Sequence, residues 1–188
     1  MRTWLRADLL IAVCALLISS LTCVATFFQT RVVANQLSAS VWPYLSYTTT
    51  FDPNGITMTI DNDGLGPAVI RSASLEVDGR EMASWEAAAK SLGKIPGIKG
   101  IGGSFTSLGP GSVIREGASH QLFHLQFTTT PRADRAAALT QLRDSFGERA
   151  AVTVCYCSTL ENCWLLSTGR DQQPVEVGHC SEAKEIGA

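Results

Sequence analysis

The sequence predicts a mainly β protein: an immunoglobulin-like β-sandwich with two short helical insertions, preceded by one N-terminal transmembrane helix. Three observations predict this fold class. An uncharged apolar stretch fills residues 9–28, short segments rich in Thr, Val, Ile and aromatic residues follow it, and turn residues separate these segments about every ten positions. Such sandwiches serve many functions, so the fold class alone defines no activity.

The stretch from Leu9 to Phe28 predicts the transmembrane helix. It carries no charge, and a helix of this length at ~1.5 Å per residue crosses a ~30 Å hydrocarbon core. The alternative is a cleavable signal peptide, whose apolar region usually covers only ~7–15 residues and ends in small residues. Cys23-Val24-Ala25 is a poor match to such a cleavage site, and the bulky Phe27 and Phe28 follow it. Apolar residues continue to Leu37, which favours an uncleaved anchor.

Flanking charges predict the orientation of this helix. Arg2, Arg6 and the amino terminus precede it, whereas Arg31 is the only basic residue between the helix and Arg71. Because basic residues stay on the cytoplasmic side, we expect the N-terminus inside and the following domain outside. Four of the six cysteines lie in residues 155–180, where an oxidising compartment would pair them.

Composition defines the domain organisation. The net charge is −2 and no basic stripe is present, which argues against nucleic acid as a partner. Pro43 ends the helical pattern, and the period-two pattern of strands begins after it. The predicted parts are a cytoplasmic N-terminus (1–8), a transmembrane helix (9–28), a helical stalk (29–40), an extracytoplasmic β-sandwich domain (41–180) and a flexible tail (181–188).

Alternation and capping residues place the secondary structure. Ile56, Met58 and Ile60 alternate with polar residues, which predicts a strand with one buried face. The predicted strands are residues 44–51, 55–62, 68–77, 111–117, 118–128, 150–157, 163–168 and 174–177. Ser84 predicts the start of a helix that ends before Gly93, and a second helix is expected over residues 130–147, closed by Gly147.

Three motifs carry a resemblance to a known group. They are S-V-W-P-Y-L at residues 40–45, N-D-G-L-G-P-A-V-I at residues 62–70 and C-Y-C-S at residues 155–158. Together they resemble uncharacterised bacterial single-pass inner-membrane proteins with a small extracytoplasmic β-rich domain. The resemblance covers most of the chain and implies location in the bacterial inner (plasma) membrane. Its motifs are turns and structural cysteines, so it implies no catalytic residue.

No catalytic, cofactor-binding or metal-binding residue is predicted. Lys94 follows a glycine but lacks the rest of the nucleotide-binding loop, and Ser104 lacks the G-x-S-x-G pattern of serine hydrolases. His120 and His124 would lie ~13 Å apart on a strand, too far to share an ion. We therefore expect neither an enzyme nor a cofactor.

The glycine-rich stretch of residues 93–111 is the predicted partner-binding loop. Loops of this length are often functional, and this one combines apolar with basic side chains. The residues expected to contact a partner are Lys94, Ile95, Ile98, Lys99 and Ile101.

Two structural disulfides are expected, Cys157–Cys163 and Cys155–Cys180. Cys157 and Cys163 flank a short loop between paired strands, where facing Cα atoms lie ~4.5–5.5 Å apart, within disulfide reach. Cys155 lies two residues back on the same face, which leaves Cys180 as its partner. The alternative is that the C-Y-C cysteines serve thiol redox chemistry or bind a metal, although they lack C-x-x-C spacing.

The sequence thus predicts a non-enzymatic, membrane-anchored extracytoplasmic binding or assembly module. Its predicted partners are the lipid bilayer, through residues 9–28, and a second envelope or membrane protein. A thiol redox or metal-binding membrane protein is the alternative.

Overall fold

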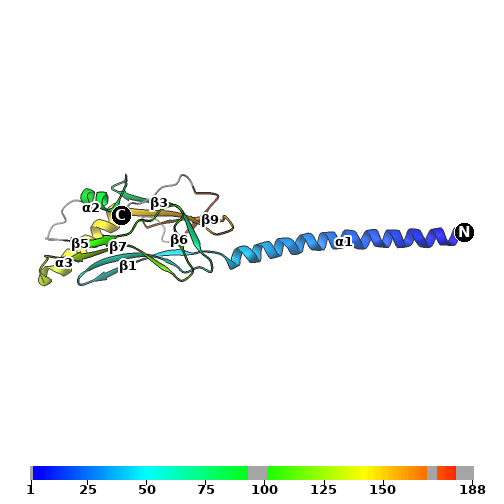
Figure 1. Cartoon of the computed structure of the whole chain (residues 1–188), viewed down its shortest axis with the longest axis horizontal. Coiled ribbons are helices and arrows are strands. Elements are labelled where there is room, and N and C mark those ends of the chain that lie inside the picture. The colour runs from blue at the N-terminus through cyan, green and yellow to red at the C-terminus, as the bar shows by residue number, and fades with distance from the viewer. Residues whose placement is uncertain (1, 93–100, 169–172, 181–188) are drawn as a thin grey trace. The chain divides into compact units, whose positions relative to one another are not determined.

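The computed structural model describes residues 2–92, 101–168 and 173–180. Contacts between residues divide the chain into two compact units, Met1–Ser40 and Val41–Ala188. The first is a helix and the second contains all the strands, as Figure 1 shows.

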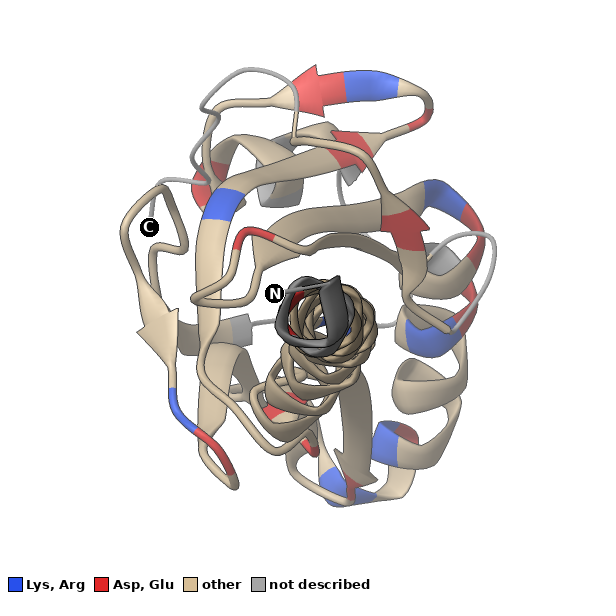
Figure 2. Cartoon of the chain, turned by 90° about the vertical axis from the view of Figure 1, so that its right-hand side faces the viewer, with Lys and Arg blue, Asp and Glu red and all other residues tan. Residues whose placement is uncertain are grey.

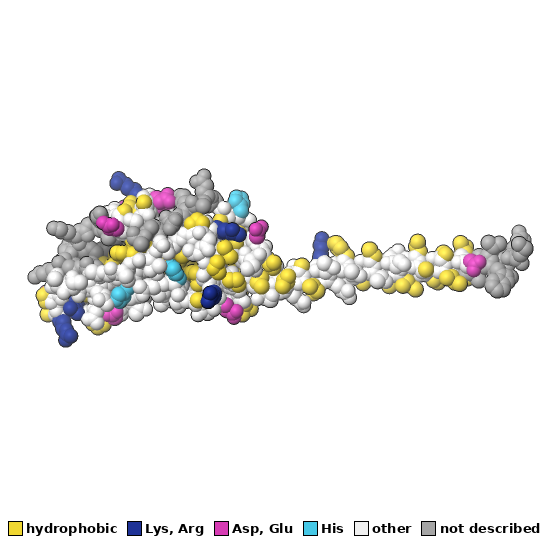
Figure 3. All heavy atoms as spheres, viewed as in Figure 1, with side chains coloured by type: hydrophobic (Ala, Val, Ile, Leu, Met, Phe, Trp, Pro, Cys, Tyr) yellow, Lys and Arg dark blue, Asp and Glu magenta, His cyan; other side chains and the backbone are white. Residues whose placement is uncertain are grey.

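The first unit is one continuous helix, α1 (Arg2–Ser40), so the expected stalk follows the apolar stretch without a break. Its part from Asp8 to Ser40 contains an 18-residue window with a mean hydropathy of 2.4, and it is long and apolar enough to cross a membrane. Apolar side chains follow its length in Figure 3. Five hydroxyls of this part donate to carbonyls four residues earlier, as Ser19 does to Ala15 and Thr22 to Ile18, so they are compatible with an apolar surrounding.

The second unit contains two antiparallel sheets (Figure 1). The first has the order β1-β2-β7-β5 and consists of β1 (Leu45–Asp52), β2 (Gly55–Asn62), β5 (Ile101–Phe105) and β7 (Ser119–Phe127). The second has the order β10-β9-β8-β3-β4, with β6 also pairing to β3. Its strands are β3 (Ala68–Val77), β4 (Arg80–Met82), β6 (Val113–Ile114), β8 (Ala150–Cys157), β9 (Cys163–Ser167) and β10 (Val175–Val177).

Both sheets contribute to one hydrophobic core. Ile56, Met58 and Ile60 of β2 are buried, which confirms the predicted alternation. They share a single cluster of buried side chains with Leu75 of β3 and Val152 of β8. Acidic and basic residues are interspersed over the part of the β unit that Figure 2 shows.

Two helices lie between strands, and their ends follow local chemistry. Helix α2 (Trp85–Leu92) begins after Ser84, whose Oγ accepts a hydrogen bond from the Ala87 N–H at 3.2 Å, as an N-cap does. A short 3-10 turn, η1 (Arg132–Asp134), leads into α3 (Arg135–Arg149). Gly147 lies inside α3, so the expectation that it closes the helix was wrong. Arg149, at the end of α3, pairs with Asp78 at the turn after β3.

Strand details also differ from the prediction. Strand β4 was not predicted; Asp78 and Gly79 join it to β3 with positive φ angles of 52° and 74°, the conformation that Asp-Gly hairpin turns adopt. Strict alternation with Leu75 and Val77 would place Val69 on the inward face of β3. The register shifts between Ile70 and Ser72, however, and Ile70 is buried while Val69 is only half-buried. A bulge moves the inward face by one residue, which period-two reasoning does not foresee.

The three motifs that carry the resemblance meet in the β unit. Asn62, 1% exposed, accepts hydrogen bonds from the N–H groups of Tyr44 and Gly64 and donates to the carbonyls of Gly66 and Ile114. The phenol oxygen of buried Tyr156, from C-Y-C, accepts a hydrogen bond from the Leu45 N–H at 3.2 Å. The motifs therefore hold together the first residues that follow α1 in the chain.

Glycine is required where these segments touch. A Cβ on Gly64 would lie 2.3 Å from the Tyr44 nitrogen, and one on Gly66 would lie 2.3 Å from the Val41 carbonyl oxygen. Both contacts are with backbone atoms that cannot move aside. Burial raises the pKa of the Tyr156 phenol to about 12, so it remains protonated and has a structural role in this junction.

Candidate functional site

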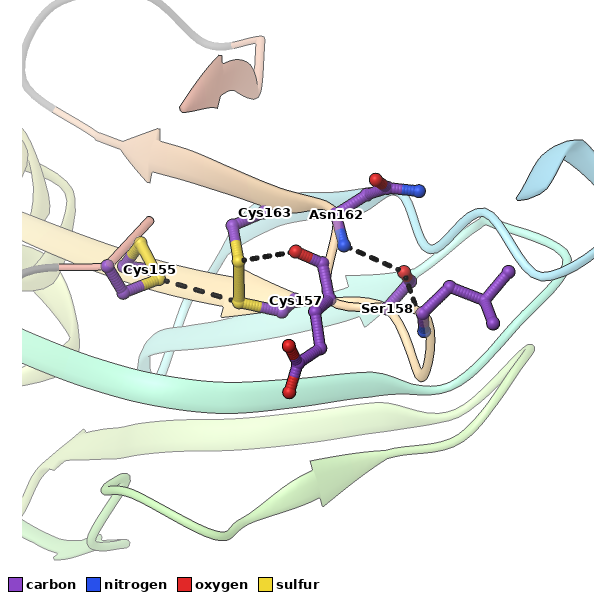
Figure 4. The surroundings of a disulfide bond; sticks show 8 residues. Cys155, Cys157, Ser158, Asn162 and Cys163 are labelled. Carbon is purple, nitrogen blue, oxygen red and sulfur yellow. Dashed lines mark hydrogen bonds between the residues drawn. A yellow bond between two sulfur atoms is a disulfide. The ribbon is translucent and has the colours of Figure 1, made fainter. Parts of the chain in front are cut away.

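The structure forms the two disulfides that the sequence analysis expects. Cys155 is bonded to Cys180 with a Cα–Cα distance of 5.8 Å, and Cys157 to Cys163 at 4.0 Å. Cys157 and Cys163 are paired directly across β8 and β9, which explains why their bond is easily formed. Figure 4 shows the two disulfides side by side at the end of these strands.

The sulfur atoms of the two bonds are close to one another. Cys157 Sγ lies 3.7 Å from Cys180 Sγ, and the sulfurs of Cys157, Cys163 and Cys180 lie within 4.8 Å of one another. The neighbouring turn is held by Ser158, whose Oγ accepts from the N–H groups of Leu160 and Asn162 (Figure 4). Three of the four half-cystines are buried, so this cluster closes one end of the second sheet.

The predicted partner-binding loop has a different structure where it can be described. Lys94, Ile95, Ile98 and Lys99 lie outside the described residues. Ile101 begins β5 and is paired with Phe127 of β7, so residues 101–105 form a strand at the end of the first sheet and not a loop. Leu108, after this strand, is fully buried. That the stretch contacts a partner stays a prediction.

The histidines of β7 are separate polar residues. His124 Nδ1 lies 2.7 Å from the Thr57 hydroxyl, and its Nε2 lies 2.6 Å from the Gln126 amide nitrogen. Neither His120 nor His124 belongs to a group of three potential metal ligands in the described part of the chain, where the only such group is the cysteine cluster.

A pocket of about 280 Å³ lies between the two sheets. Its wall comes from β1, β2 and β7 of one sheet, β3 and β8 of the other, and both helices. The buried part of the wall is formed by Ile56, Met58, Leu75, Trp85, Phe123 and Val152. Its more exposed part is formed by Tyr47, Thr49, Phe51, Arg143, Phe146, Gly147, Ala150 and Thr168.

Aromatic contacts fix the wall of the pocket. The Trp85 ring stacks on Phe105 at 6.2 Å between centroids and meets Phe123 edge to face at 5.2 Å. Phe123 in turn contacts Phe146 of α3 at 5.5 Å. The Tyr47 hydroxyl donates to the Thr168 carbonyl at 3.4 Å, which links β1 to the segment after β9 beside the pocket.

Two residues of the pocket wall, Trp85 and Arg143, carry a nitrogen-bearing group, and of these only Arg143 is exposed. Trp85 is 2% exposed, and its Nε1 has no hydrogen-bond partner among the described residues. Leaving such a donor unpaired costs ~1–3 kcal/mol. The guanidinium of Arg143 lies 5.7 Å from the centroid of the Phe51 ring, and Arg143 is the only charged residue in the pocket wall described above.

Sequence reasoning missed this pocket because seven separate elements form it. The alternation of Tyr47, Thr49 and Phe51 places them on one face of β1, but the sequence does not show that this face is incompletely covered.

Comparison of the chain with protein-family models, curated proteins and solved structures found no match. The structure itself defines a class: a mainly β unit of two sheets that follows a long apolar helix.

Proposed function

We propose that the chain is a membrane-anchored, non-enzymatic binding module, and that the pocket between its sheets is the binding site. The observation that carries the proposal is the mainly apolar pocket of about 280 Å³, which five aromatic side chains line and which the exposed guanidinium of Arg143 borders. Pockets that are mainly apolar and contain a few polar groups are the usual sites for small ligands. The two sheets with a shared core support an immunoglobulin-like β-sandwich as the scaffold.

The proposed location is the outer face of a bacterial inner membrane. Residues 9–28 form the anchor, the basic residues Arg2 and Arg6 favour a cytoplasmic N-terminus, and the paired cysteines favour an oxidising compartment for residues 41–180. A reporter fused after Ala188 should be active only if it functions outside the cytoplasm. Activity of a reporter that works only in the cytoplasm would contradict this location.

Binding is tested with a small neutral aromatic compound, 3-phenylpropanamide, added to the full chain in nanodiscs and followed by ligand-observed NMR. We expect saturable binding that Thr49→Trp abolishes, since Thr49 lines the pocket and the larger ring would fill it. Thr50→Trp is the matched control because Thr50 is the next residue of β1 and lies exposed. Equal binding by the two variants, or no binding by the original chain, would contradict the proposed site.

A second candidate function is thiol redox chemistry, favoured by the 3.7 Å distance between Cys157 Sγ and Cys180 Sγ. If an external thiolate attacked one disulfide to form a mixed disulfide, the thiolate that leaves would lie next to the other disulfide, as exchange requires. Titration of native thiols separates the candidates. Structural disulfides leave only Cys14 and Cys23 reactive in the denatured, unreduced chain, whereas a redox protein isolated from cells would show additional thiols or mixed disulfides.

A further inference from the structure

We infer that the ligand of this pocket is a small aromatic carboxylate, with its ring against Trp85 and its carboxylate at Arg143. The inference rests on the proposed function and identifies the chemical class of its ligand. Three features of the wall lead to it: the size of the pocket, its aromatic character and the position of its single charge.

Size limits the ligand to a small molecule. A volume of about 280 Å³ corresponds to roughly nine water molecules at ~30 Å³ each. This space suits a compound of about ten to twelve non-hydrogen atoms and excludes a folded peptide or a long acyl chain. A single aromatic ring with a short side arm has this size.

The wall favours an aromatic ring over an alkyl chain. Tyr47, Phe51, Trp85, Phe123 and Phe146 all line the pocket, and aromatic groups pack against one another in edge-to-face and offset arrangements. An alkyl chain has no π-system and would not make these ring contacts, so an aromatic ring suits this wall better.

The charge at the pocket favours an anion. Arg143 is exposed on α3 and lies near the exposed ring of Phe51, so the apolar wall continues directly to a guanidinium. The described part of the chain shows no ion pair between Arg143 and an acidic residue. A carboxylate can make two parallel hydrogen bonds to a guanidinium, the geometry in which arginine binds carboxylates best.

The test compares 3-phenylpropionate with its isosteric neutral amide on the full chain in nanodiscs at pH 7 and low salt. We expect the carboxylate to bind about tenfold more tightly, because it can form an ion pair with two parallel hydrogen bonds to Arg143, whereas the amide offers one neutral acceptor. Arg143→Met should remove this preference, because it should weaken binding of the carboxylate about tenfold more than binding of the amide. Arg132→Met is the matched control: Arg132 lies in η1 and outside this pocket, so that variant should keep the preference.

Two further measurements test the aromatic part. Phe51→Leu removes one exposed ring from the wall but keeps an apolar side chain there, and it should weaken binding of 3-phenylpropionate about two- to fivefold. 3-Cyclohexylpropionate, which has the same length and charge, should bind more weakly than 3-phenylpropionate to the original chain, and its affinity should change less on Phe51→Leu.

The outcomes distinguish this inference from the proposed function. If the original chain binds the amide and the carboxylate equally, the carboxylate assignment is overturned and the pocket remains a binding site. The same holds if Arg132→Met reduces the preference for the carboxylate as much as Arg143→Met does. If the cyclohexyl compound binds as well as the phenyl compound, the aromatic assignment is overturned. If none of the compounds binds saturably, both the inference and the proposed function fail.

Discussion

Replacing Asn62 by Ala should destabilise the β unit by about 4 kcal/mol. The Asn62 side chain takes part in four hydrogen bonds, at 3.3 and 3.1 Å to the N–H groups of Tyr44 and Gly64 and at 2.9 and 3.0 Å to the carbonyls of Gly66 and Ile114. At ~1 kcal/mol net for each bond, the loss sums to the stated value. Alanine supplies no replacement, and the site is 1% exposed, so bulk water compensates poorly.

The assay is urea denaturation of the full chain in mild detergent, followed by tryptophan fluorescence. Asn62→Asp keeps both acceptor interactions but places an oxygen against two carbonyls, so we expect it to lose at least the ~2 kcal/mol of the two donated bonds. Asp63→Ala is the control: Asp63 is the exposed neighbour in the same turn, its carboxylate accepts one exposed hydrogen bond from Ser46, and its loss should change the free energy of unfolding by ~1 kcal/mol or less. A loss below ~1 kcal/mol for Asn62→Ala would refute the reasoning.

Three further changes test other parts of the fold. Replacing both cysteines of the Cys155–Cys180 bond by Ser should lower the free energy of unfolding by about 3.5 kcal/mol, and the same change at Cys157–Cys163 should lower it by about 2 kcal/mol. The first bond closes a loop with a separation of 25 residues and the second one of 6, and the longer loop has more entropy to lose. Urea midpoints that rank the two variants in the opposite order would contradict the loop-entropy account. Asp78→Asn should make the free energy of unfolding less dependent on pH in the acid range. Arg149 holds the pKa of Asp78 in the folded chain below its ordinary value of 3.8, so the ion pair stabilises the fold above pH 3.8. This stabilisation is lost as the pH falls through the lowered pKa of the folded chain. A melting-temperature profile that has the same acid slope in Asp78→Asn as in the original chain, with Asp144→Asn as the control, would argue against this ion pair. Gly147→Ala should stabilise the protein by ~0.5–1 kcal/mol, since Gly147 lies inside α3 and an added Cβ meets no atom within 4 Å; a lower urea midpoint would show that the glycine is needed.

Local chemistry predicted much of the fold. The apolar stretch of residues 9–28 predicted a long helix, Ser84 predicted the start of α2, and the alternation of Ile56 with Ile60 predicted the buried face of β2. The pairing of Cys157 with Cys163 followed from their positions at the ends of adjacent strands. Each of these depends on residues that are near in sequence.

The failures arise where distant residues decide the structure. Pairing with β7 converts Ile101–Phe105 from an expected loop into an edge strand, and burial of Leu108 holds the segment after it. Continued backbone hydrogen bonding carries α3 through Gly147, where the residue type alone predicts an end. The pocket could not be predicted, because Thr49, Trp85 and Arg143 meet only after both sheets and both helices are assembled.

Methyl NMR of the full chain in nanodiscs tests the pocket as a binding site most directly. The chain has three methionines: Met58 lines the pocket, whereas Met82 packs against the core from β4, outside the pocket wall, and Met1 is the first residue. With methionine methyl groups labelled with carbon-13, addition of 3-phenylpropionate should shift the Met58 signal saturably and leave the Met82 signal in place. An unmoved Met58 signal, or equal shifts of Met58 and Met82, would contradict the account.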